Sequence, residues 1–232
     1  MYNLRDLVLA NALFGGNTGG GGGGGSAEEW IGDGKTHLWI KIAAEGRMGV
    51  SLYFSQTVAN GVTIDWGDGS APQTLSGTDK VKTTHTYASI GEYCITLDVA
   101  DGCTLGLGRG SQMYCVLGTT SANSKVYTNR LQKAEIGNGV TSLNGYAFSN
   151  CYSLASISIP DSVTSIGSNA FDACCGLAKI RFDGMTPPTV ANSNAFTGIL
   201  TDCVISVPVG CLNAYKAAAN YPDPATYTYI EE

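Results

Sequence analysis

The sequence predicts a mainly β protein: a small β-sandwich followed by a short repeat solenoid with a C-terminal helical cap. Three observations support this class. A unit of fixed length recurs from residue 131, and apolar residues alternate with polar ones between residues 36 and 99. The 31 glycines, with many Ser and Thr, favour turns and strands over long helices. Hydrophobic residues make up 44% of the 232 residues, which is enough for packed cores.

Matched positions in the repeats carry matched side chains. Leu131, Leu154 and Leu177 follow one another at equal intervals. The middle unit reads L-x-x-I-x-I-P-x-x-V-T-S-I-G-x-x-A-F-x-x-C, and such a period indicates one supersecondary unit stacked on its neighbours. We expect three inward-facing groups in this unit: Leu154, Ile157 and Ile159 from a strand, then Val163 and Ile166, then Ala170, Phe171 and Cys174.

The third repeat is longer than the others. The interval from Phe182 to Phe196 exceeds the matching interval from Ile159 to Phe171 by two residues, so this unit carries a two-residue insertion near Pro187-Pro188. The spacing then returns, and it predicts a final strand at residues 205–208. Residues 210–219 read as a closing helix, and Tyr221 with residues 227–230 is expected to cover the open end.

This repeat resembles the BspA-like (Treponema pallidum-type) leucine-rich repeat family. The signature I-P-x-x-V-T-S-I-G-x-x-A-F-x-x-C is kept in full up to Cys174, and V-P-x-G-x-x-x-A-Y-K at residues 207–216 is typical of how such arrays end. The resemblance covers about residues 131–232. Relatives often carry many repeats and this chain has three, so a large concave binding surface does not follow from the resemblance.

The alternating strands before the repeats are short and are separated by turn residues, as in a β-sandwich. Three motifs follow in order, W-G-D-G at residues 66–69, H-T-Y at 85–87 and G-E-Y-C-I at 91–95. Together they resemble the PKD (polycystic kidney disease) domain over about residues 36–102, and the resemblance implies an Ig-like sandwich.

Each motif residue has a structural interpretation. We expect Trp66 to fill the core, Gly67 and Gly69 to adopt positive φ, and Asp68 to cap the turn through backbone N–H groups. Tyr87 is expected to anchor a corner through its hydroxyl. Two alternatives compete with these interpretations: Ca²⁺ held by Asp65 and Asp68, or His85 as a general base.

Eight cysteines, at positions 94, 103, 115, 151, 174, 175, 203 and 211, suggest either a disulfide framework or a metal site. There is no C-x-x-C motif and there are only two histidines, and Cys151 and Cys174 share a buried repeat position. We therefore predict reduced thiols that fill the core, and no metal site. A Cys94–Cys103 bridge is left open.

The segment formed by residues 1–27 differs from the rest of the chain. Residues 2–14 form an apolar helix candidate, whereas residues 19–25 are seven consecutive glycines that cannot hold a fold. We interpret this as a docking segment on a flexible linker, with Leu4, Leu7, Val8, Leu13 and Phe14 as candidate docking residues. A secretory signal is the alternative, but Asp6 lies beside Arg5, Asn11 interrupts the apolar run and no convincing A-x-A site follows.

The sequence thus divides into five predicted segments: 1–14 N-terminal docking segment, 15–27 Gly-rich linker, 28–103 PKD-like sandwich, 104–130 linker and solenoid N-cap, and 131–232 repeats with a C-terminal cap. In the repeat strands the non-core positions should line the exposed sheet face in two ladders. These are the candidate interaction residues: Lys133, Ser156 and Lys179 in one ladder, and Glu135, Ser158 and Arg181 in the next. A solvated face without a ligand is the alternative.

The net charge of −6 argues against nucleic acid or anionic membrane as a partner, and no run approaches the roughly 18 apolar residues of a membrane span. No catalytic constellation or cofactor motif is present, so we predict a protein that is not an enzyme and has no cofactor. Both resembled families are mostly extracellular binding and spacer modules in bacteria and their phages.

We therefore expect a virion or extracellular surface protein. The favoured interpretation is a phage decoration or fibre that attaches to a phage structural protein through its N-terminal segment and adheres to a host surface protein or glycan. The alternatives are a secreted or cell-surface bacterial leucine-rich repeat adhesin, and an accessory binding module of a polysaccharide-degrading system. Whether the chain forms a homo-oligomer is left open.

Overall fold

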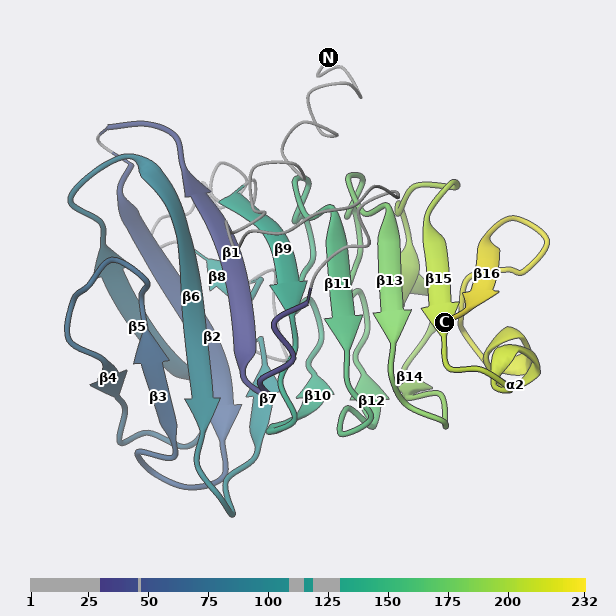
Figure 1. The fold of residues 1–232 in the computed structure, drawn as a ribbon, viewed down its shortest axis with the longest axis horizontal. Coiled ribbons are helices and arrows are strands. Elements are labelled where there is room, and N and C mark those ends of the chain that lie inside the picture. Colours follow the sequence, from purple (N-terminus) through teal and green to yellow (C-terminus); the bar gives the residue numbers. More distant parts are fainter. Residues whose placement is uncertain (1–29, 46, 109–114, 119–129) are drawn as a thin grey trace, which may run out of the picture. The chain divides into compact units, whose positions relative to one another are not determined.

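The structure is a computed structural model, and it describes residues 30–45, 47–108, 115–118 and 130–232. Residues Asp33–Glu232 form one compact unit whose regular elements are mostly strands (Figure 1). The mainly β class predicted from the sequence is confirmed. The strands form two mixed sheets, and each sheet runs from an antiparallel first half into a parallel second half.

The first sheet has nine strands in the order β16-β15-β13-β11-β9-β1-β6-β3-β4. Its antiparallel half contains β1 (Thr36–Ile42), β3 (Val62–Asp65), β4 (Gln73–Thr74) and β6 (Gly91–Val99). Its parallel half contains β9 (Leu131–Glu135), β11 (Ser156–Ile159), β13 (Lys179–Phe182), β15 (Val204–Val207) and β16 (Thr228–Glu231).

The second sheet has seven strands, of which six run in the order β14-β12-β10-β7-β2-β5 and β8 pairs with β2. Its first half contains β2 (Gly49–Gln56), β5 (Val81–Thr86), β7 (Leu105–Leu107) and β8 (Leu117–Gly118). Its second half contains β10 (Val140–Leu143), β12 (Ser165–Ile166) and β14 (Thr189–Val190).

Each repeat gives one strand to each sheet, and the period of the sequence appears as the register of the first sheet. Ile157 of β11 pairs with Ala134 of β9 on one side and with Ile180 of β13 on the other. Parallel pairing places equivalent residues side by side, so the same position of each repeat recurs in one row. The predicted stacking of Leu131, Leu154 and Leu177 in the core is consistent with their complete burial.

The aromatic positions of the repeats form a stacked column in the core. The rings of Phe148 and Phe171 are nearly parallel and stacked, with centroids 5.5 Å apart, and Phe171 and Phe196 repeat this spacing. Cys151 and Cys174, three residues after Phe148 and Phe171, are fully buried. All three inward-facing groups predicted for the middle repeat are buried as well. The apolar residues of the repeat signature are therefore the ones that folding removes from water.

The two-residue insertion in the third repeat is distributed over two places. The pairing of Ile180 with Ile157 keeps the repeat period, but Val190 pairs with Ile166 at a separation one residue longer. Phe196, at the end of the 3₁₀ helix η3 (Ser193–Phe196), follows Phe171 at a separation two residues longer than the period. One extra residue therefore precedes β14 and one follows it, so the pairing of β14 with β12 survives.

The end of the array differs from the prediction in one respect. The strand predicted at residues 205–208 is observed as β15 and the closing helix as α2 (Leu212–Ala217), but β15 is not the last strand. Residues 228–231 form β16, which pairs in parallel with β15. The segment expected only to cover the open end thus extends the sheet, because a bare edge leaves N–H and C=O groups without partners.

The two halves are joined through both sheets. In the first sheet β1 pairs antiparallel with β9, so that Leu38 lies opposite Ala134. In the second sheet β7 pairs in parallel with β10, with Val140 opposite Leu105. A solenoid needs a cap over its first apolar layer. We predicted that cap at residues 104–130, and within this range β7 lies against the first repeat, but on the first sheet β1 takes this place.

The motif residues of the first half take the places that were predicted for them. Trp66 is buried, and the Tyr87 hydroxyl donates a hydrogen bond to the Trp66 carbonyl over 2.9 Å. Gly67 has φ 75°, and a Cβ there would lie closer than 3.0 Å to the Cys94 carbonyl oxygen, so only glycine fits. Two facing sheets carry these residues, but their assignment to a PKD domain stays a prediction.

The predicted segment boundaries also stay predictions, although both sheets cross the boundary that was placed between residues 103 and 131. The predicted docking segment 1–14 and linker 15–27 lie outside the described residues. All eight cysteines are free, including Cys94 and Cys103. Six of them are buried as expected, but Cys175 is exposed and Cys94 is half-buried, so these two do not fill the core.

Candidate interaction surface

The six predicted interaction residues lie side by side on one face of the first sheet. Strand alternation puts every second side chain on the same face, and parallel register aligns these positions between strands. Ser156 pairs with Lys133 and Lys179, and Ser158 pairs with Glu135 and Arg181. The two ladders predicted from the repeat are thus observed as rows of neighbouring residues.

Both rows are longer than the sequence predicted. On one side β1 adds Trp39 beside Lys133 and His37 beside Glu135. On the other side β15 adds Val204 beside Lys179 and Ser206 beside Arg181. Trp39 and His37 were missed because they belong to the first half of the chain, far in sequence from their neighbours in the row. We call the resulting set the ladder face: His37, Trp39, Lys133, Glu135, Ser156, Ser158, Lys179, Arg181, Val204 and Ser206.

Opposite charges are close together on and around the ladder face. Lys179 Nζ lies 3.0 Å from Glu232 Oε1, and Arg181 Nε lies 2.6 Å from Asp183 Oδ1. The hydrogen bond from Lys179 lowers the pKa of Glu232 below its ordinary value. These pairs are partly exposed, so each contributes little to stability. Their effect is that two cationic side chains of the face are locally neutralised.

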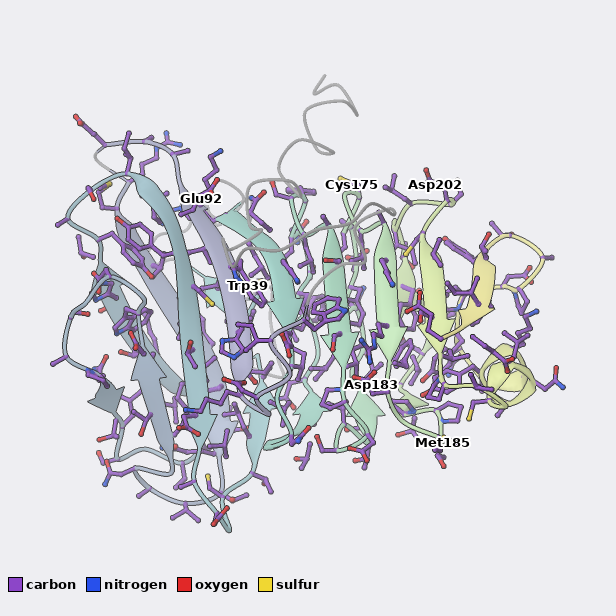
Figure 2. The ribbon with its side chains drawn as sticks, in the orientation of Figure 1. Trp39, Glu92, Cys175, Asp183, Met185 and Asp202 are labelled. Carbon is purple, nitrogen blue, oxygen red and sulfur yellow. The ribbon has the colours of Figure 1, made fainter. Side chains whose placement is uncertain are left out.

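Trp39 gives the face its aromatic character. The Lys133 ammonium lies over the Trp39 ring, 4.8 Å from the centroid, which is within cation–π range. Figure 2 labels Trp39 on β1, Glu92 on the neighbouring strand β6, and Asp183 directly after β13. Lys41, two residues after Trp39, is 3.5 Å from Glu92. An aromatic ring surrounded by hydrogen-bonding side chains suits a polar ligand with apolar patches.

Not all of the ladder face is exposed as predicted. Ser156, Ser158 and Glu135 are only 3%, 5% and 6% exposed. Ser206, at the end of one row, is only 1% exposed as well. Trp39, Lys179 and Arg181 are half-buried, so they are among the more accessible residues of the face.

The imidazole ring of His37 is held in place by contacts with three residues. Its Nε2 lies 2.9 Å from Asp33 Oδ1, its Nδ1 lies 3.2 Å from Thr96 Oγ1, and Cys94 Sγ is 3.7 Å from Nδ1. Partial burial raises the pKa of Asp33, but the hydrogen bonds from His37 and the Lys35 N–H, together with the charges of both residues, lower the pKa below its ordinary 3.8. The ring is buried, so His37 is not one of the accessible residues of the ladder face.

The second histidine, His85, takes part in the W-G-D-G turn. Its Nε2 lies 2.7 Å from Asp68 Oδ2, and its ring stacks on Trp66 with centroids 4.8 Å apart. Asp68 Oδ1 accepts the Ser70 N–H and Asp65 Oδ1 accepts the Gly67 N–H. Hydrogen bonds from Ser70 and His85 lower the pKa of Asp68 to about 2. Turn capping by Asp68, predicted from the sequence, is confirmed.

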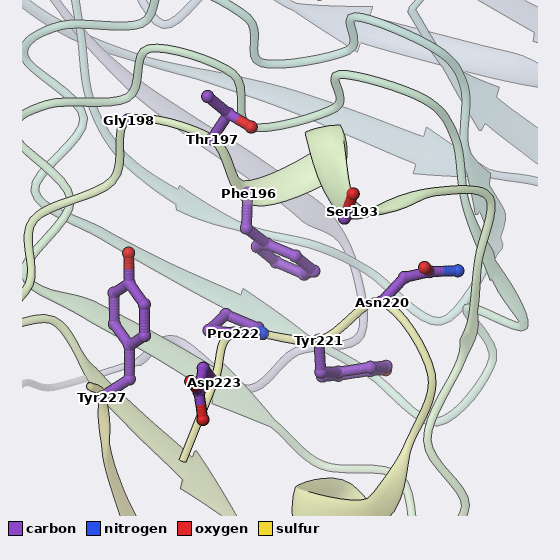
Figure 3. Close-up of a pocket in the computed structure, with 9 residues that line it drawn as sticks. All are labelled: Ser193, Phe196, Thr197, Gly198, Asn220, Tyr221, Pro222, Asp223 and Tyr227. Atoms are coloured by element: carbon purple, nitrogen blue, oxygen red, sulfur yellow. The ribbon is translucent and has the colours of Figure 1, made fainter. Parts of the chain in front are cut away.

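A cavity of about 270 Å³ lies at the C-terminal end of the array (Figure 3). Phe196, Tyr221, Asp223 and Tyr227 are among the residues that line it. The Tyr221 hydroxyl donates to the Pro188 carbonyl over 2.9 Å, and Asp223 Oδ1 accepts the Ala225 N–H. These groups are engaged in closing the end of the Phe column, so the cavity is a weaker binding candidate than the ladder face.

The remaining site predictions have the following outcomes. The candidate docking residues Leu4, Leu7, Val8, Leu13 and Phe14 lie outside the described residues. In the described part of the chain, no cluster of three or more His, Cys, Asp or Glu side chains is placed to hold a metal ion. No helix among the described residues is both long and apolar enough to cross a membrane.

Comparison with known proteins gives one family match. Residues 120–212 match the family model described as "BspA type Leucine rich repeat region (6 copies)". The match includes the three repeats and the ladder strands β9, β11, β13 and β15. It leaves out residues 28–103, so the likeness of that segment to the PKD domain stays a prediction. No curated protein matches the chain.

Proposed function

We propose that this chain is a non-enzymatic recognition protein that binds a macromolecular partner through the ladder face. The family match supports the general class, because BspA-type repeats commonly serve as surface adhesion or protein-binding modules. The structure supports the location, because the matched segment builds two uninterrupted rows of outward side chains.

The continuity of these rows into the first half of the chain is the observation that carries the proposal. A face of four short parallel strands is small for a macromolecular ligand. Pairing of β1 with β9 extends it by a strand and adds Trp39, a residue type that is enriched at binding hot spots. The binding surface is thus formed jointly by the repeats and the first half.

The charge arrangement narrows the chemistry of the partner. Lys41, Lys179 and Arg181 each lie within 4 Å of a carboxylate, so the face lacks the unpaired cationic cluster that polyanions require. The partner that fits is a neutral glycan or a polar protein surface, held by hydrogen bonds and by contact with Trp39.

Binding of the full chain to immobilised neutral surface polysaccharides and to purified cell-surface proteins tests the proposal. A triple variant, Trp39→Ala, Lys179→Ala and Arg181→Ala, should lose at least about tenfold in affinity, as expected for hot-spot residues. The matched control is Lys82→Ala, Thr84→Ala and Thr86→Ala on β5, whose side chains are exposed on the second sheet. Retained binding by the first variant, or equal loss in both, would contradict the proposal.

The more specific proposal is that the protein is a phage virion decoration or fibre, attached through residues 1–27. It rests on the sequence of that segment, an apolar stretch followed by a glycine run. Mass spectrometry of purified particles tests whether the chain is present. Deletion of residues 1–27 should abolish incorporation while leaving the rest of the chain folded, and normal incorporation would show that the docking interpretation is wrong.

Two alternatives have distinct signatures. A secreted bacterial adhesin would show a processed N-terminus in the native producer. An accessory module of a polysaccharide-degrading system would change the hydrolysis of an insoluble polysaccharide by a partner enzyme, and that effect would be lost when Asp65 or Asp68 is replaced.

A further inference from the structure

Two cysteines from different parts of the chain meet in the core of the parallel half. Cys115 Sγ lies 2.7 Å from Cys151 Sγ, and both residues are buried. Cys115 lies two residues before β8, whereas Cys151 occupies the repeated Cys position three residues after Phe148. The two residues are 36 positions apart in the sequence.

Backbone hydrogen bonds hold both residues in place. The Val116 N–H, next to Cys115, donates to the Ala147 carbonyl over 2.5 Å, and the Tyr53 N–H donates to the Val116 carbonyl over 3.1 Å. The Cys151 N–H donates to the Phe148 carbonyl over 3.0 Å. The backbone around Cys115 is thus hydrogen-bonded to both β2 and the first repeat, and the backbone at Cys151 is hydrogen-bonded within that repeat. These bonds keep the two sulfur atoms close together.

We propose that Cys115 and Cys151 form a disulfide when the protein folds in the presence of a low-molecular-weight disulfide. One cysteine thiolate attacks the small disulfide, giving a mixed disulfide and releasing one small thiol. The other cysteine then attacks the mixed disulfide, forming the Cys115–Cys151 bond and releasing a second small thiol. Two protein thiols are oxidised and one small disulfide is reduced, so electrons and protons balance.

The surroundings of Cys151 determine when this reaction takes place. Burial raises the pKa of the Cys151 thiol well above its ordinary value, so little thiolate is present in the folded protein. Oxidation of the folded, reduced chain should therefore be slow, and oxidation during folding should be fast. The bond would connect residues 115–118, which lie against β2, to the first repeat.

The experiment refolds the full chain with oxidised glutathione and compares it with chain refolded in reductant. After alkylation of free thiols, cleavage by trypsin and at Asp gives one peptide, residues 110–125, that contains only Cys115. A second peptide, residues 134–160, contains only Cys151, separate from Cys174 and Cys175. We expect these two peptides joined and lighter by two hydrogen atoms. We also expect a Tm higher by roughly 5–10 °C than that of the reduced protein.

The variants Cys115→Ser and Cys151→Ser should each lack the cross-link and the rise in Tm. Cys174→Ser, which removes the neighbouring thiol of the next repeat, should keep the cross-link. The peptide map of the unaltered chain decides the matter even if a variant does not fold. Alkylation of both Cys115 and Cys151 after oxidative refolding, or a bond from either of them to another cysteine, would overturn the proposal.

Discussion

Phe171 lies at the middle of the aromatic column and is fully buried. Phe148 stacks on one side of its ring and Phe196 on the other, each with a centroid distance of 5.5 Å. Because both neighbours are themselves fixed by the repeat register, the structure has little freedom to close a cavity at this position.

Phe171→Ala should therefore lower the free energy of unfolding by about 3–5 kcal/mol, the range for deleting a buried aromatic ring. Met185→Ala is the control, since Met185 is 66% exposed and its truncation should change the free energy by less than about 0.5 kcal/mol. Denaturant unfolding measures both. Similar effects of the two substitutions would contradict the stacked column.

Asp68 makes stability depend on pH. Its pKa is about 2 in the folded protein, compared with 3.8 ordinarily, through hydrogen bonds from Ser70 and His85. A lowered folded-state pKa means that the ionised carboxylate stabilises the fold at pH values above 3.8. This stabilisation is lost as the pH falls from about 4 to about 2.

Asp68→Asn should thus reduce Tm at pH 6, and the difference from the unaltered protein should shrink as the pH approaches 2. Asp79→Asn, at an exposed position, is the control for removing one negative charge. Thermal unfolding at several pH values measures the difference. A deficit for Asp68→Asn that is the same at all pH values would show that the carboxylate charge is not what stabilises the turn.

The roles of single residues were predictable where they depend on a local motif. Trp66, Gly67 and Tyr87 have fixed spacing and fixed turn geometry, so the sequence motif was enough to place them. Burial of Ser156 and Ser158 was not predictable from alternation, because alternation assigns a side chain to one face of the sheet and does not say whether that face is covered. The contact between Cys115 and Cys151 was missed because no period relates them.

At the scale of elements, the glycine of the repeat signature allows two successive repeats to approach each other closely. Gly167 follows β12, and a Cβ there would lie closer than 3.0 Å to the backbone nitrogen of Gly145 in the preceding repeat. Real Cβ atoms do not approach backbone this closely, so a larger residue would push two successive repeats apart. The strand spacing of the second sheet thus depends on this position.

Gly167→Ala should lower the free energy of unfolding by about 1–3 kcal/mol, as overpacking does. Gly77→Ala is the matched control: its Cβ would make an ordinary contact, 3.5 Å from a Val81 methyl group, and should cost less than about 0.5 kcal/mol. Urea titration of both variants gives the comparison. Equal stability of the two would mean that the repeats separate without cost.

Period and spacing predicted most elements of the parallel half, because each repeat strand is short and begins within two residues of its consensus Leu. The insertion was located to the third repeat, but its division between the two sides of β14 depends on sheet pairing and was not readable from spacing. Strand β16 was missed because T-Y-I-E carries no repeat signature and gains its partner only from the edge of β15.

At the scale of the whole unit, the decisive feature is the pairing between its halves. Sequence patterns placed strands on both sides, but the pairing of β1 with β9 joins segments that are far apart in the sequence, and no local pattern encodes such a partner. This pairing carries Trp39 and His37 into the rows that the repeats begin. The ladder face, and the proposal built on it, therefore depend on residues Asp33–Glu232 folding together.

Calorimetric unfolding of the full chain tests this claim most directly. If the sheets are continuous, residues Asp33–Glu232 should unfold in one transition whose calorimetric and van't Hoff enthalpies agree. Phe171→Ala in the second half and Asp68→Asn in the first should each shift that single transition to lower temperature. Two separable transitions, each shifted by only one of the substitutions, would show that the halves fold independently and that the ladder face is not a single surface.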